Sequence, residues 1–387
     1  MDGSTDSLSD SSTISSSRIS QASAGRSFPR DEQVMTSLSK NVPDHTTAEA
    51  PEAFGLRISI VVLNYNTKDL LVGCLSNIAA QLGSAAADIE ILVIDNCSTD
   101  GSVVAAQQTG IPTRTVVCDG NLGYTGGMNV GIAEAKSEYV CLVTTDVRPC
   151  DGAFETLLRT ARQNQTAAII GCKLLRGNTE QVDSAGGIIL YPLGMAVAVR
   201  TAVDSQKPYE VPFVGGAFVL VRKSLVSRIG GFREDLFAYY DEVELCVRAW
   251  NAGFRVICEP RAVARHFAGG TFGQRKELRR FLMERNRLMV TVSVLSASDF
   301  LPFLLFESLY FLGNIAVSFS ANNPKLARPY LVALAETLPR GRDLRKATAE
   351  SRRANGLSET FHRQMSRLGL LRTFNMIWRE YNGQTQD

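Results

Sequence analysis

Two neighbouring carboxylates, Asp241 and Glu242, follow two tyrosines in the stretch LFAYYDEVELCVRAWNAG, residues 236–253. They open a segment with helical spacing, so one interpretation is structural. Asp241 then caps the helix, and Glu244, three residues later, completes a capping box. The other interpretation is chemical. A helix N-terminus stabilises negative charge, so a carboxylate there is expected to stay deprotonated near neutral pH and to serve as a base.

Polar residues also gather where short apolar runs end. Such runs are typical of strands buried on both faces, and segments with helical spacing separate them. The polar groups that end the runs are Asn64, Tyr65 and Asn66; Asp95 and Asn96; and Thr144, Thr145 and Asp146. Alternating strands and helices predict an α/β fold with a mainly parallel sheet, in which ligands bind beyond the carboxyl ends of the strands.

The types of these strand-end residues suit a nucleotide. The amides of Asn64 and Asn66 and the ring of Tyr65 match the edge and face of a flat base. Asp95 closes a strand, and its carboxylate can accept a hydrogen bond from a pyrimidine N–H or a ribose hydroxyl. Asp100 lies in a turn before a helix and is predicted to cap that helix.

Asp146 follows a buried strand, where a carboxylate is costly unless it has a partner. A divalent cation on a nucleotide diphosphate would be such a partner, and a helix cap is the alternative. The Gly-rich turn NLGYTGGMNVG, residues 121–131, leads into a helix whose N-terminus favours phosphate. Its spacing is that of neither a dinucleotide fingerprint nor a P-loop, and ordinary loop geometry is an equal alternative.

Six segments in order resemble glycosyltransferase family 2, the inverting GT-A enzymes, and most closely its rhamnosyltransferase-like branch. They are VVLNYN, ILVIDNCSTDGS, NLGYTGGMNVGI, CLVTTDVRP, FVGGAFVLVRKSLVSRIGGFREDLFAYYDEVELCVRAWNAGF and AVARHFAGG. The resemblance covers about residues 57–290. It implies a GT-A fold, in which helices flank a mainly parallel sheet.

The resemblance also implies roles for individual residues. The nucleotide base and ribose would be held by Asn64, Tyr65, Asn66 and Asp95, with Asn96 and Asp100 in the same substrate-binding set. The nucleotide-sugar cleft would be lined by Asn121, Gly123, Gly126, Gly127 and Asn129, and the donor sugar and acceptor would be approached by Gly215, Gly216 and Ala217. The metal, Mg²⁺ or Mn²⁺ on the diphosphate, would be bound by Asp146 and completed by His266.

Two positions depart from the family pattern. The metal motif usually reads D-x-D or N-P-D, whereas this chain has Thr144, Thr145 and Asp146. A hydroxyl and waters can fill part of a Mg²⁺ site. The acidic pair is commonly Glu-Asp, whereas this chain has Asp241 and Glu242. Alignment of the pair favours Glu242 as the catalytic base, with Asp241 as a cap or an acceptor-binding partner.

The two ends of the chain differ from this middle part. Residues 1–54 are rich in Ser, Thr, Asp and Ala and predict a disordered tail, and residues 55–290 form the predicted glycosyltransferase domain. Residues 291–387 predict a helical, membrane-associating region. It contains the apolar run 300–319, interrupted by Pro302 and Glu307, and an amphipathic helix within 340–380. The run could cross a bilayer, lie in its surface or pack in a core, and shallow insertion is favoured because basic segments flank it.

The composition limits the compartment and the partners. A net charge of +2 argues against a general polyanion-binding protein, and eight cysteines without a C-x-x-C pair predict buried thiols in a reducing compartment. The predicted location is the cytoplasmic face of a membrane, with a nucleotide diphosphate sugar as donor, a lipid-linked or polysaccharide glycan as acceptor, and no nucleic acid. The donor is dTDP-L-rhamnose or a UDP-hexose.

The sequence leaves two alternative functions to be considered. The first is a non-catalytic, membrane-attached partner in glycan assembly that retains the fold, because the metal motif is incomplete. The second is a sugar nucleotidyltransferase, which would need a Gly-rich basic loop near the first strand. The segment VVLNYNTKDLL offers only Lys68 and no glycine.

Overall fold

The computed structural model describes residues 58–83, 89–200, 206–267, 276–294, 300–320, 327–341, 346 and 365–367. All of them belong to one compact unit, residues 42–387. The tail predicted for residues 1–54 lies outside the described residues.

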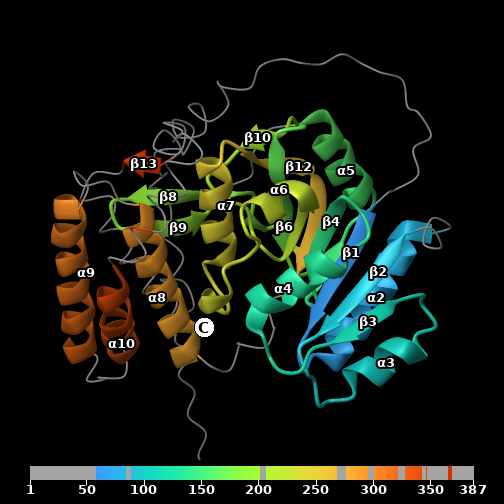
Figure 1. The fold of residues 1–387 in the computed structure, drawn as a ribbon, viewed down its shortest axis with the longest axis horizontal. Helices are drawn as coiled ribbons and strands as arrows, with labels where there is room; N and C mark the ends of the chain where they lie inside the picture. Colours follow the sequence, from blue (N-terminus) through green and yellow to red (C-terminus); the bar gives the residue numbers. More distant parts are fainter. Residues whose placement is uncertain are drawn as a thin grey trace, which may run out of the picture. The chain divides into compact units, whose positions relative to one another are not determined.

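A ten-stranded mixed sheet forms the centre of the described part (Figure 1), in the order β10, β12, β6, β11, β4, β1, β2, β3. One parallel group consists of β4 (Tyr139–Thr144), β1 (Ile58–Asn64), β2 (Glu90–Asp95) and β3 (Arg114–Val117). A second parallel pair consists of β6 (Ala167–Arg176) and β12 (Arg255–His266). The antiparallel strand β11 (Phe218–Arg222) joins the two groups. Two further short strands lie off this order and complete the ten: β5 (Val147–Pro149) pairs with β12, and β7 (Val182–Ser184) pairs with β6. The short strand β10 (Tyr209–Glu210) is the edge strand next to β12.

Helices cover both faces of the sheet, which explains why its strands are apolar throughout. Successive side chains of a strand point to opposite faces. Ile60 and Val62 of β1 pack in the core that also contains the buried faces of α2 (Lys68–Leu82) and α5 (Ala153–Gln163). Val61 points to the other face, where α4 (Gly123–Glu134) packs so closely that a Cβ on Gly131 would lie 2.3 Å from the Val61 side chain. The predicted α/β fold with a mainly parallel sheet is confirmed.

The remaining helices of this part connect the strands. They are α3 (Ser102–Gln108), α6 (Lys223–Arg228), the short 3₁₀ helix η2 (Glu234–Leu236) and α7 (Asp241–Asn251). A second, three-stranded sheet consists of β8 (Gly187–Tyr191), β9 (Met195–Ala198) and β13 (Met365–Arg367). β13 pairs in parallel with β8, so the helix predicted within 340–380 is wrong at these three residues. Most of the rest of that span lies outside the described residues.

Helices α8 (Lys276–Val294), α9 (Phe300–Ser320) and α10 (Arg328–Thr337) follow the large sheet, and η4 (Leu338–Arg340) ends this region. The domain boundary predicted at residue 290 falls inside α8, so one continuous helix spans both predicted regions. The apolar run 300–319 is helical, as expected. In the part of the chain that the structure describes, no helix has the length and apolarity to cross a bilayer.

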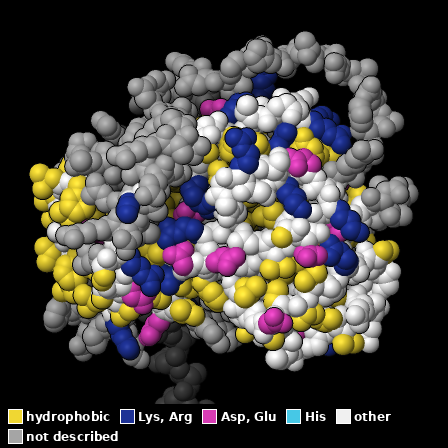
Figure 2. Space-filling model, in the orientation of Figure 1, with side chains coloured by type: hydrophobic (Ala, Val, Ile, Leu, Met, Phe, Trp, Pro, Cys, Tyr) yellow, Lys and Arg dark blue, Asp and Glu magenta, His cyan; other side chains and the backbone are white. Residues whose placement is uncertain are grey.

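Glu307 and Asn314 of α9 are buried, whereas the described leucines of this helix are exposed. Glu307 is buried and forms a bidentate ion pair with Arg287 of α8, at 2.7 and 2.9 Å. Leu301 is 75% exposed, and other apolar side chains of α9 share its outer face. Figure 2 shows these hydrophobic side chains gathered over α9 at the left of the view. This is the reverse of the usual pattern of a helix on a soluble protein, in which polar residues face water.

Candidate active site

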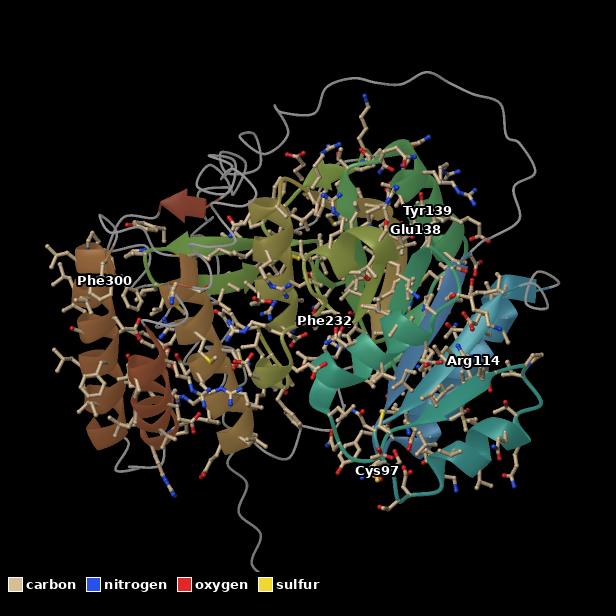
Figure 3. The ribbon with its side chains drawn as sticks, in the orientation of Figure 1. Cys97, Arg114, Glu138, Tyr139, Phe232 and Phe300 are labelled. Carbon is tan, nitrogen blue, oxygen red and sulfur yellow. The ribbon has the colours of Figure 1, made fainter. Side chains whose placement is uncertain are left out.

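The polar strand ends meet at one edge of the large sheet, as parallel pairing requires. Asn64 and Asp95, the last residues of β1 and β2, lie opposite each other, and Leu63 lies opposite Thr144 of β4. In Figure 3, Cys97, just past the end of β2, and Tyr139, at the start of β4, lie at opposite edges of the sheet. The residues predicted to bind the base, the ribose and the metal therefore share the carboxyl edge of the sheet.

A hydrogen-bond network joins the loop after β1 to the loop after β2. Asn64 donates from Nδ2 to Asp95 Oδ1 at 2.7 Å, and Asp95 Oδ2 accepts from the backbone N–H of Ser98 at 2.8 Å. Asn66 Oδ1 accepts from the backbone N–H of Thr99 at 2.8 Å. Asn64 and Asp95 are fully buried, whereas Asn66 is exposed. The buried pair fixes the two loops, and Asn66 and the half-buried Tyr65 form the surface that a ligand could touch.

Asp100 has a structural role at two helix starts. Its Oδ1 accepts from the backbone N–H of Ser102 in α3 at 3.0 Å, and its Oδ2 accepts from that of Lys68 in α2 at 2.9 Å. The N-cap position of α3 is Gly101 rather than Asp100 itself. These hydrogen bonds lower the pKa of Asp100 although burial opposes them. The carboxylate satisfies backbone donors at both helix starts, which is the function predicted for a cap.

The glycines of the Gly-rich turn allow close packing within the protein rather than only the approach of a ligand. A Cβ on Gly123 would lie 2.3 Å from the Phe237 carbonyl oxygen, and one on Gly127 would lie 2.4 Å from Leu63. A Cβ on Gly126 would meet the Leu122 side chain at 2.6 Å. Alanine at any of these positions would move α4 or the loop that it supports.

The N-terminus of α4 is already occupied in part, which corrects the expectation of a free phosphate site. The backbone N–H groups of Tyr124 and Thr125 both donate to the Phe237 carbonyl. Asn129, predicted to line the cleft, binds the segment after Gly231 instead. Its Nδ2 donates to the Phe232 carbonyl at 2.9 Å, and its Oδ1 accepts from the Phe232 N–H at 2.7 Å.

Asn96 and Asn121 connect the loop after β2 to the start of α4. Asn96 Nδ2 donates to the Gly123 carbonyl at 2.7 Å, and Asn121 Oδ1 accepts from the Gly123 N–H at 2.9 Å. Asn96 Oδ1 is buried and has no hydrogen-bond partner within the described residues. A buried acceptor without a partner is costly, and a donor group on a bound ligand would satisfy it.

Asp146 and His266 converge, as predicted for a metal site. His266 ends β12, Asp146 follows β4, and the antiparallel pairing of β5 with β12 brings them together. His266 Nε2 lies 3.5 Å from Asp146 Oδ2, and Thr144 Oγ1 donates to Asp146 Oδ1 at 2.6 Å. Burial raises the pKa of Asp146, but the hydrogen bond and charge of His266 outweigh it and lower the pKa.

His266 has a second carboxylate on its other side. Its Nδ1 lies 2.9 Å from Oδ2 of Asp183, a residue of β7 that the sequence did not single out. Burial lowers the pKa of His266, but the hydrogen bonds to Asp146 and Asp183 outweigh it and raise the pKa to about 9.

The donor set fits a divalent ion bound together with a diphosphate. Across the described ranges, no group of three or more His, Cys, Asp or Glu side chains gathers as a complete metal site. Mg²⁺ in nucleotide sites commonly takes one or two protein carboxylates and completes its shell with phosphate oxygens and water. Asp146 offers one carboxylate and His266 one imidazole nitrogen, so the two residues suit a metal that arrives with the nucleotide.

Asp241 and Glu242 do not form the capping box. The N-cap of α7 is Tyr240 in a left-handed conformation, and it makes no side-chain capping bond. Asp241 is the first residue of the helix, and the Glu244 carboxylate pairs with Arg248 at 2.6 Å instead of reaching back to the cap. The predicted capping box is therefore wrong.

Burial also corrects the expectation that the pair stays deprotonated. Asp241 is buried, and burial together with the charge of Glu242 raises its pKa well above the ordinary value. Burial raises the pKa of the half-buried Glu242 to about 7. Desolvation outweighs the helix N-terminus here, and Glu242 becomes a group that exchanges protons near neutral pH.

The predicted donor-sugar segment lies directly beside this pair. A Cβ on Gly216 would lie 3.4 Å from Glu242 Cβ and 3.1 Å from Tyr124 Oη, and Tyr124 donates to the Gly216 carbonyl at 2.6 Å. The Ala217 carbonyl accepts from the Thr144 N–H at 3.0 Å. Segment 215–217 thus connects the acidic pair to the strand end that carries Asp146.

Two tyrosines near this pair were not predicted as site residues. Tyr124 lies within the Gly-rich turn, and burial with the charges of Asp241 and Glu242 raises its pKa. Burial also raises the pKa of Tyr239, opposed by Arg279, and Asp241, Asp146 and Glu242 contribute to it in that order. Tyr239 is thus within electrostatic reach of both Asp146 and the acidic pair. Its place in the Tyr-Tyr-Asp-Glu stretch is the only sequence signal for it.

The loop before the pair is strained and braced. Phe237, Tyr239 and Tyr240 all have positive φ, which costs about 1–3 kcal/mol for each such residue. Asn286 of α8 is fully buried, and its Nδ2 donates to the carbonyls of Leu236, Ala238 and Tyr239 at 2.7–3.0 Å. A helix placed outside the family motifs therefore holds the loop that positions Glu242.

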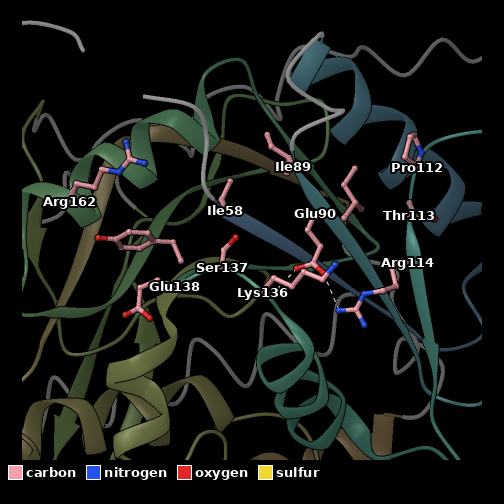
Figure 4. A pocket seen from close by; sticks show the side chains of 12 residues that line it. Ile58, Ile89, Glu90, Pro112, Thr113, Arg114, Lys136, Ser137, Glu138 and Arg162 are labelled. Carbon is pink, nitrogen blue, oxygen red and sulfur yellow. Dashed lines mark hydrogen bonds and ion pairs between the residues drawn. The ribbon is translucent and has the colours of Figure 1, made fainter. Parts of the chain in front are cut away.

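A cavity of about 850 Å³ lies elsewhere, at the opposite edge of the sheet. It is lined by the first residues of strands, among them Ile58, Glu90 and Arg114, and Figure 4 shows Glu90 paired with Arg114 there. Ligands of such sheets bind at the carboxyl ends of the strands, and this cavity lies at the amino ends. Glu90 and Arg114 also form an ion pair with each other there, so we place the active site at the other edge.

Comparison with known proteins supports one family. A family model described as Glycosyl transferase family 2 matches residues 59–230. An N-acetylglucosaminyl-diphospho-decaprenol L-rhamnosyltransferase of Mycobacterium tuberculosis is 28% identical over 212 residues, 48% of this chain and 69% of that protein. A low-salt glycan biosynthesis hexosyltransferase of Haloferax volcanii is 26% identical over 199 residues, 50% of this chain and 61% of that protein. A glycosyltransferase of Streptococcus pneumoniae, GlyG, is 32% identical over 185 residues, 44% of this chain and 58% of that protein.

The fold also matches a solved structure. The crystal structure of GalNAc-T7 with UDP, GalNAc and Mn²⁺ aligns with a TM-score of 0.50 at 14% sequence identity. The alignment covers 62% of this chain and 48% of that chain, so this chain spans about half of that structure. At this identity the likeness concerns the fold, and it confirms the expected GT-A architecture.

Proposed function

We propose that the chain is an inverting enzyme of glycosyltransferase family 2, whose family model matches residues 59–230. It moves a sugar from dTDP-L-rhamnose or a UDP-hexose to a hydroxyl of a lipid-linked or polysaccharide glycan. The observation that carries the proposal is Glu242, a half-buried carboxylate beside Gly216 with a pKa raised to about 7. A general base works best when its pKa lies near the operating pH.

The donor nucleotide occupies the carboxyl ends of β1 and β2. Asn64 and Asp95 hold the two loops rigid, and Asn66 and Tyr65 contact the base. The buried, unpartnered Asn96 Oδ1 accepts a hydrogen bond from the nucleotide. Two of the relatives that match this chain are a rhamnosyltransferase and a hexosyltransferase, which supports the two donor classes.

Glu242 accepts the proton of the acceptor hydroxyl as that oxygen attacks the anomeric carbon. The attack comes from the face opposite the departing diphosphate, so a single displacement inverts the anomeric centre. Asp241 lies beside the base, and burial together with the charge of Glu242 raises its pKa well above the ordinary value. Gly216 lies directly beside Glu242 and Tyr124, where even a Cβ would be in close contact with both side chains.

Asp146 and His266 hold the metal that accompanies the diphosphate. When bound, Mg²⁺ or Mn²⁺ stabilises the negative charge that develops on the leaving group. The presence of Mn²⁺ with UDP in the GalNAc-T7 crystal structure supports a divalent cofactor. The Thr144 hydroxyl, which donates to Asp146 Oδ1, leaves Oδ2 on the side of His266.

The C-terminal helices hold the enzyme at the cytoplasmic face of a membrane, near a lipid-linked acceptor. The support is the outward apolar face of α9, with Leu305 57% and Leu312 59% exposed, and the exposed Arg328 and Arg340 nearby in sequence. Apolar side chains flanked by cations suit an anionic lipid surface. The acceptor named for the Mycobacterium tuberculosis relative is itself attached to a lipid, decaprenol.

A donor screen tests the proposed function. Purified protein is incubated with UDP-, dTDP- and GDP-sugars and with Mg²⁺, Mn²⁺ or EDTA, and nucleoside diphosphate release is measured with and without a membrane-lipid extract. We expect metal-dependent release from one donor and a product of inverted anomeric configuration by NMR. Glu242→Gln should abolish transfer while donor binding persists. Folded protein that binds no nucleotide sugar and releases nothing would instead support the non-catalytic partner.

A further inference from the structure

Asp183 lies next to the metal site but has no role in the function proposed above. It belongs to β7, which pairs with β6, and β6 pairs with β12 so that Arg176 lies opposite His266. Asp183 and His266 therefore lie on strands that flank β6, and ladder hydrogen bonds fix their separation. His266 Nδ1 lies 2.9 Å from Asp183 Oδ2.

We propose that Asp183 is a positioning residue for the metal: it orients His266 so that Nε2 and Asp146 Oδ2 face one divalent ion. This inference rests on the proposed function. When Asp183 accepts the Nδ1–H, the lone pair of the neutral imidazole is left on Nε2, the nitrogen that faces Asp146. A carboxylate behind a ligating histidine is a recurrent arrangement that fixes the ring and makes it a stronger ligand.

The distances fit this arrangement. His266 Nε2 and Asp146 Oδ2 are 3.5 Å apart. Two bonds of about 2.1 Å to one ion place their ligand atoms roughly 3.0–3.5 Å apart, depending on the angle between them. Asp183 is itself held in place, because its Oδ1 lies 3.2 Å from Arg176 Nε. Both of its oxygens are used, so it acts through His266 rather than as a ligand.

Asp183 also accounts for the departure in the metal motif. A D-x-D motif brings two carboxylates to the metal, whereas this chain has a threonine at the first position, Thr144. The structure supplies a second negative charge from another strand, behind the histidine. Asp183 thus brings a second carboxylate close to the site, with Arg176 on its other oxygen.

Direct measurement of Mn²⁺ binding tests the proposal. Free Mn²⁺ is quantified by electron paramagnetic resonance against the full chain with UDP or dTDP present. Asp183→Asn keeps the shape but removes the charge, and we expect Mn²⁺ affinity to fall about 10–100-fold. Asp183→Glu should recover part of that loss. In turnover, the Mn²⁺ concentration at half-maximal rate should rise for Asp183→Asn, and saturating Mn²⁺ should restore most of kcat.

Glu180→Gln is the matched control. Glu180 belongs to the same β6–β7 turn and pairs with Arg265, the neighbour of His266, at 2.8 Å. Its loss should leave Mn²⁺ affinity unchanged within about twofold. In a double-mutant cycle, Asp183→Asn should add little to the loss caused by His266→Ala, because both act through one ring.

Several outcomes overturn the proposal. They are an Asp183→Asn protein with wild-type Mn²⁺ affinity, an equal loss in Glu180→Gln, additive losses in the cycle, and a wild-type protein that binds no Mn²⁺ with either nucleotide. The proposed function fails separately. A wild-type protein that binds Mn²⁺ and nucleotide through Asp183 but transfers no sugar would retain the positioning role and lose the transferase assignment.

Discussion

Burial raises the pKa of Glu242, so the proton transfer proposed for it predicts a particular pH dependence of the rate. A base with a pKa of about 7 is protonated, and therefore inactive, at lower pH. We expect kcat/KM to fall about tenfold for each pH unit below about 7 and to level off above it. The measurement is the rate from about pH 5 to about pH 9 at fixed metal. A profile that is flat through neutrality would assign the proton transfer to another group.

The same burial has a cost in stability. The pKa of Glu242 is raised from 4.5 to about 7 in the folded state, so the folded protein binds the proton more tightly than the unfolded chain. Its contribution to stability is complete below about pH 4.5 and is lost as pH rises to about 7, a change on the order of 3 kcal/mol at most. Glu242→Gln should therefore stabilise the protein relative to wild type more at pH 8 than at pH 5 (both approximate).

Urea unfolding of both proteins at the two pH values measures this difference. Glu234→Gln is a suitable control, because Glu234 is an exposed carboxylate. An equal effect of Glu242→Gln at both pH values would show that desolvation of Glu242 is small.

At the scale of residues, the sequence predicted those that depend on chain order and missed those that depend on pairing across the sheet. Asn64, Asp95 and Asp146 follow apolar runs, and their meeting point follows from parallel pairing alone. Asp183 comes near His266 only through the pairing of β7, β6 and β12. The capping box failed because Tyr240 takes the cap position in a left-handed conformation, which no residue type there signals.

At the scale of elements, α8 supports the loop that precedes Asp241 and the proposed base Glu242. Asn286 supplies three hydrogen bonds to carbonyls of residues 236–239, whose backbone is strained. Asn286→Asp replaces the donor with an acceptor that repels those carbonyls. We expect kcat to fall roughly 100-fold, because small misplacements of a catalytic group have effects of this size, while donor affinity changes little.

Asn314→Asp is the matched control for this prediction. Asn314 is a buried asparagine of α9 whose Nδ2 donates to the Tyr310 carbonyl, away from the loop. If both variants lose kcat and thermal stability together, the effect of Asn286 is on folding in general. If only Asn286→Asp loses kcat, α8 is a functional part of the site.

The ion pair between Arg287 and Glu307 makes a second prediction for these helices. Both side chains are less than 10% exposed, and Tyr330 of α10 also donates to Glu307. Glu307→Leu alone leaves a buried guanidinium without its main partner and should cost about 3–5 kcal/mol. Arg287→Met with Glu307→Leu should recover most of that loss, as measured by thermal or urea unfolding. A double variant no better than the single one would show that the pair is needed for packing geometry.

Helices and strands were predictable where the hydrophobic periodicity extends over enough residues to be recognised. The first strands and helices, from β1 to β4, formed close to their expected ranges because apolar runs and helical spacing alternate there. The three-residue strands β5, β7 and β13 were missed, since pairing with a neighbour defines them and three residues carry no period. From the sequence, Glu307 interrupts an apolar helix. Only the structure shows that it pairs with Arg287 of α8.

At the scale of the molecule, the outward face of α9 predicts binding to lipid. Leu305→Ser with Leu312→Ser removes two exposed leucines, each worth about 1.5–3 kcal/mol when buried. We expect the fraction bound to anionic phospholipid vesicles to fall at least tenfold in sedimentation. Val104→Ser, at an apolar residue 56% exposed on α3, is the control. Equal binding by all three proteins, or binding by none, would argue against a lipid-facing α9.

The brace from α8 also bears on how such enzymes can be recombined. The segment that matches the family model ends at residue 230, before Glu242, His266 and Asn286. A chimaera that exchanged residues 59–230 alone would combine the proposed donor site of one parent with the proposed base, the proposed metal ligand and the loop support of another. Crossovers placed after α8, beyond Val294, would keep these groups together. The segment that must be exchanged as one piece to preserve the proposed site is thus longer than the segment that matches the family model.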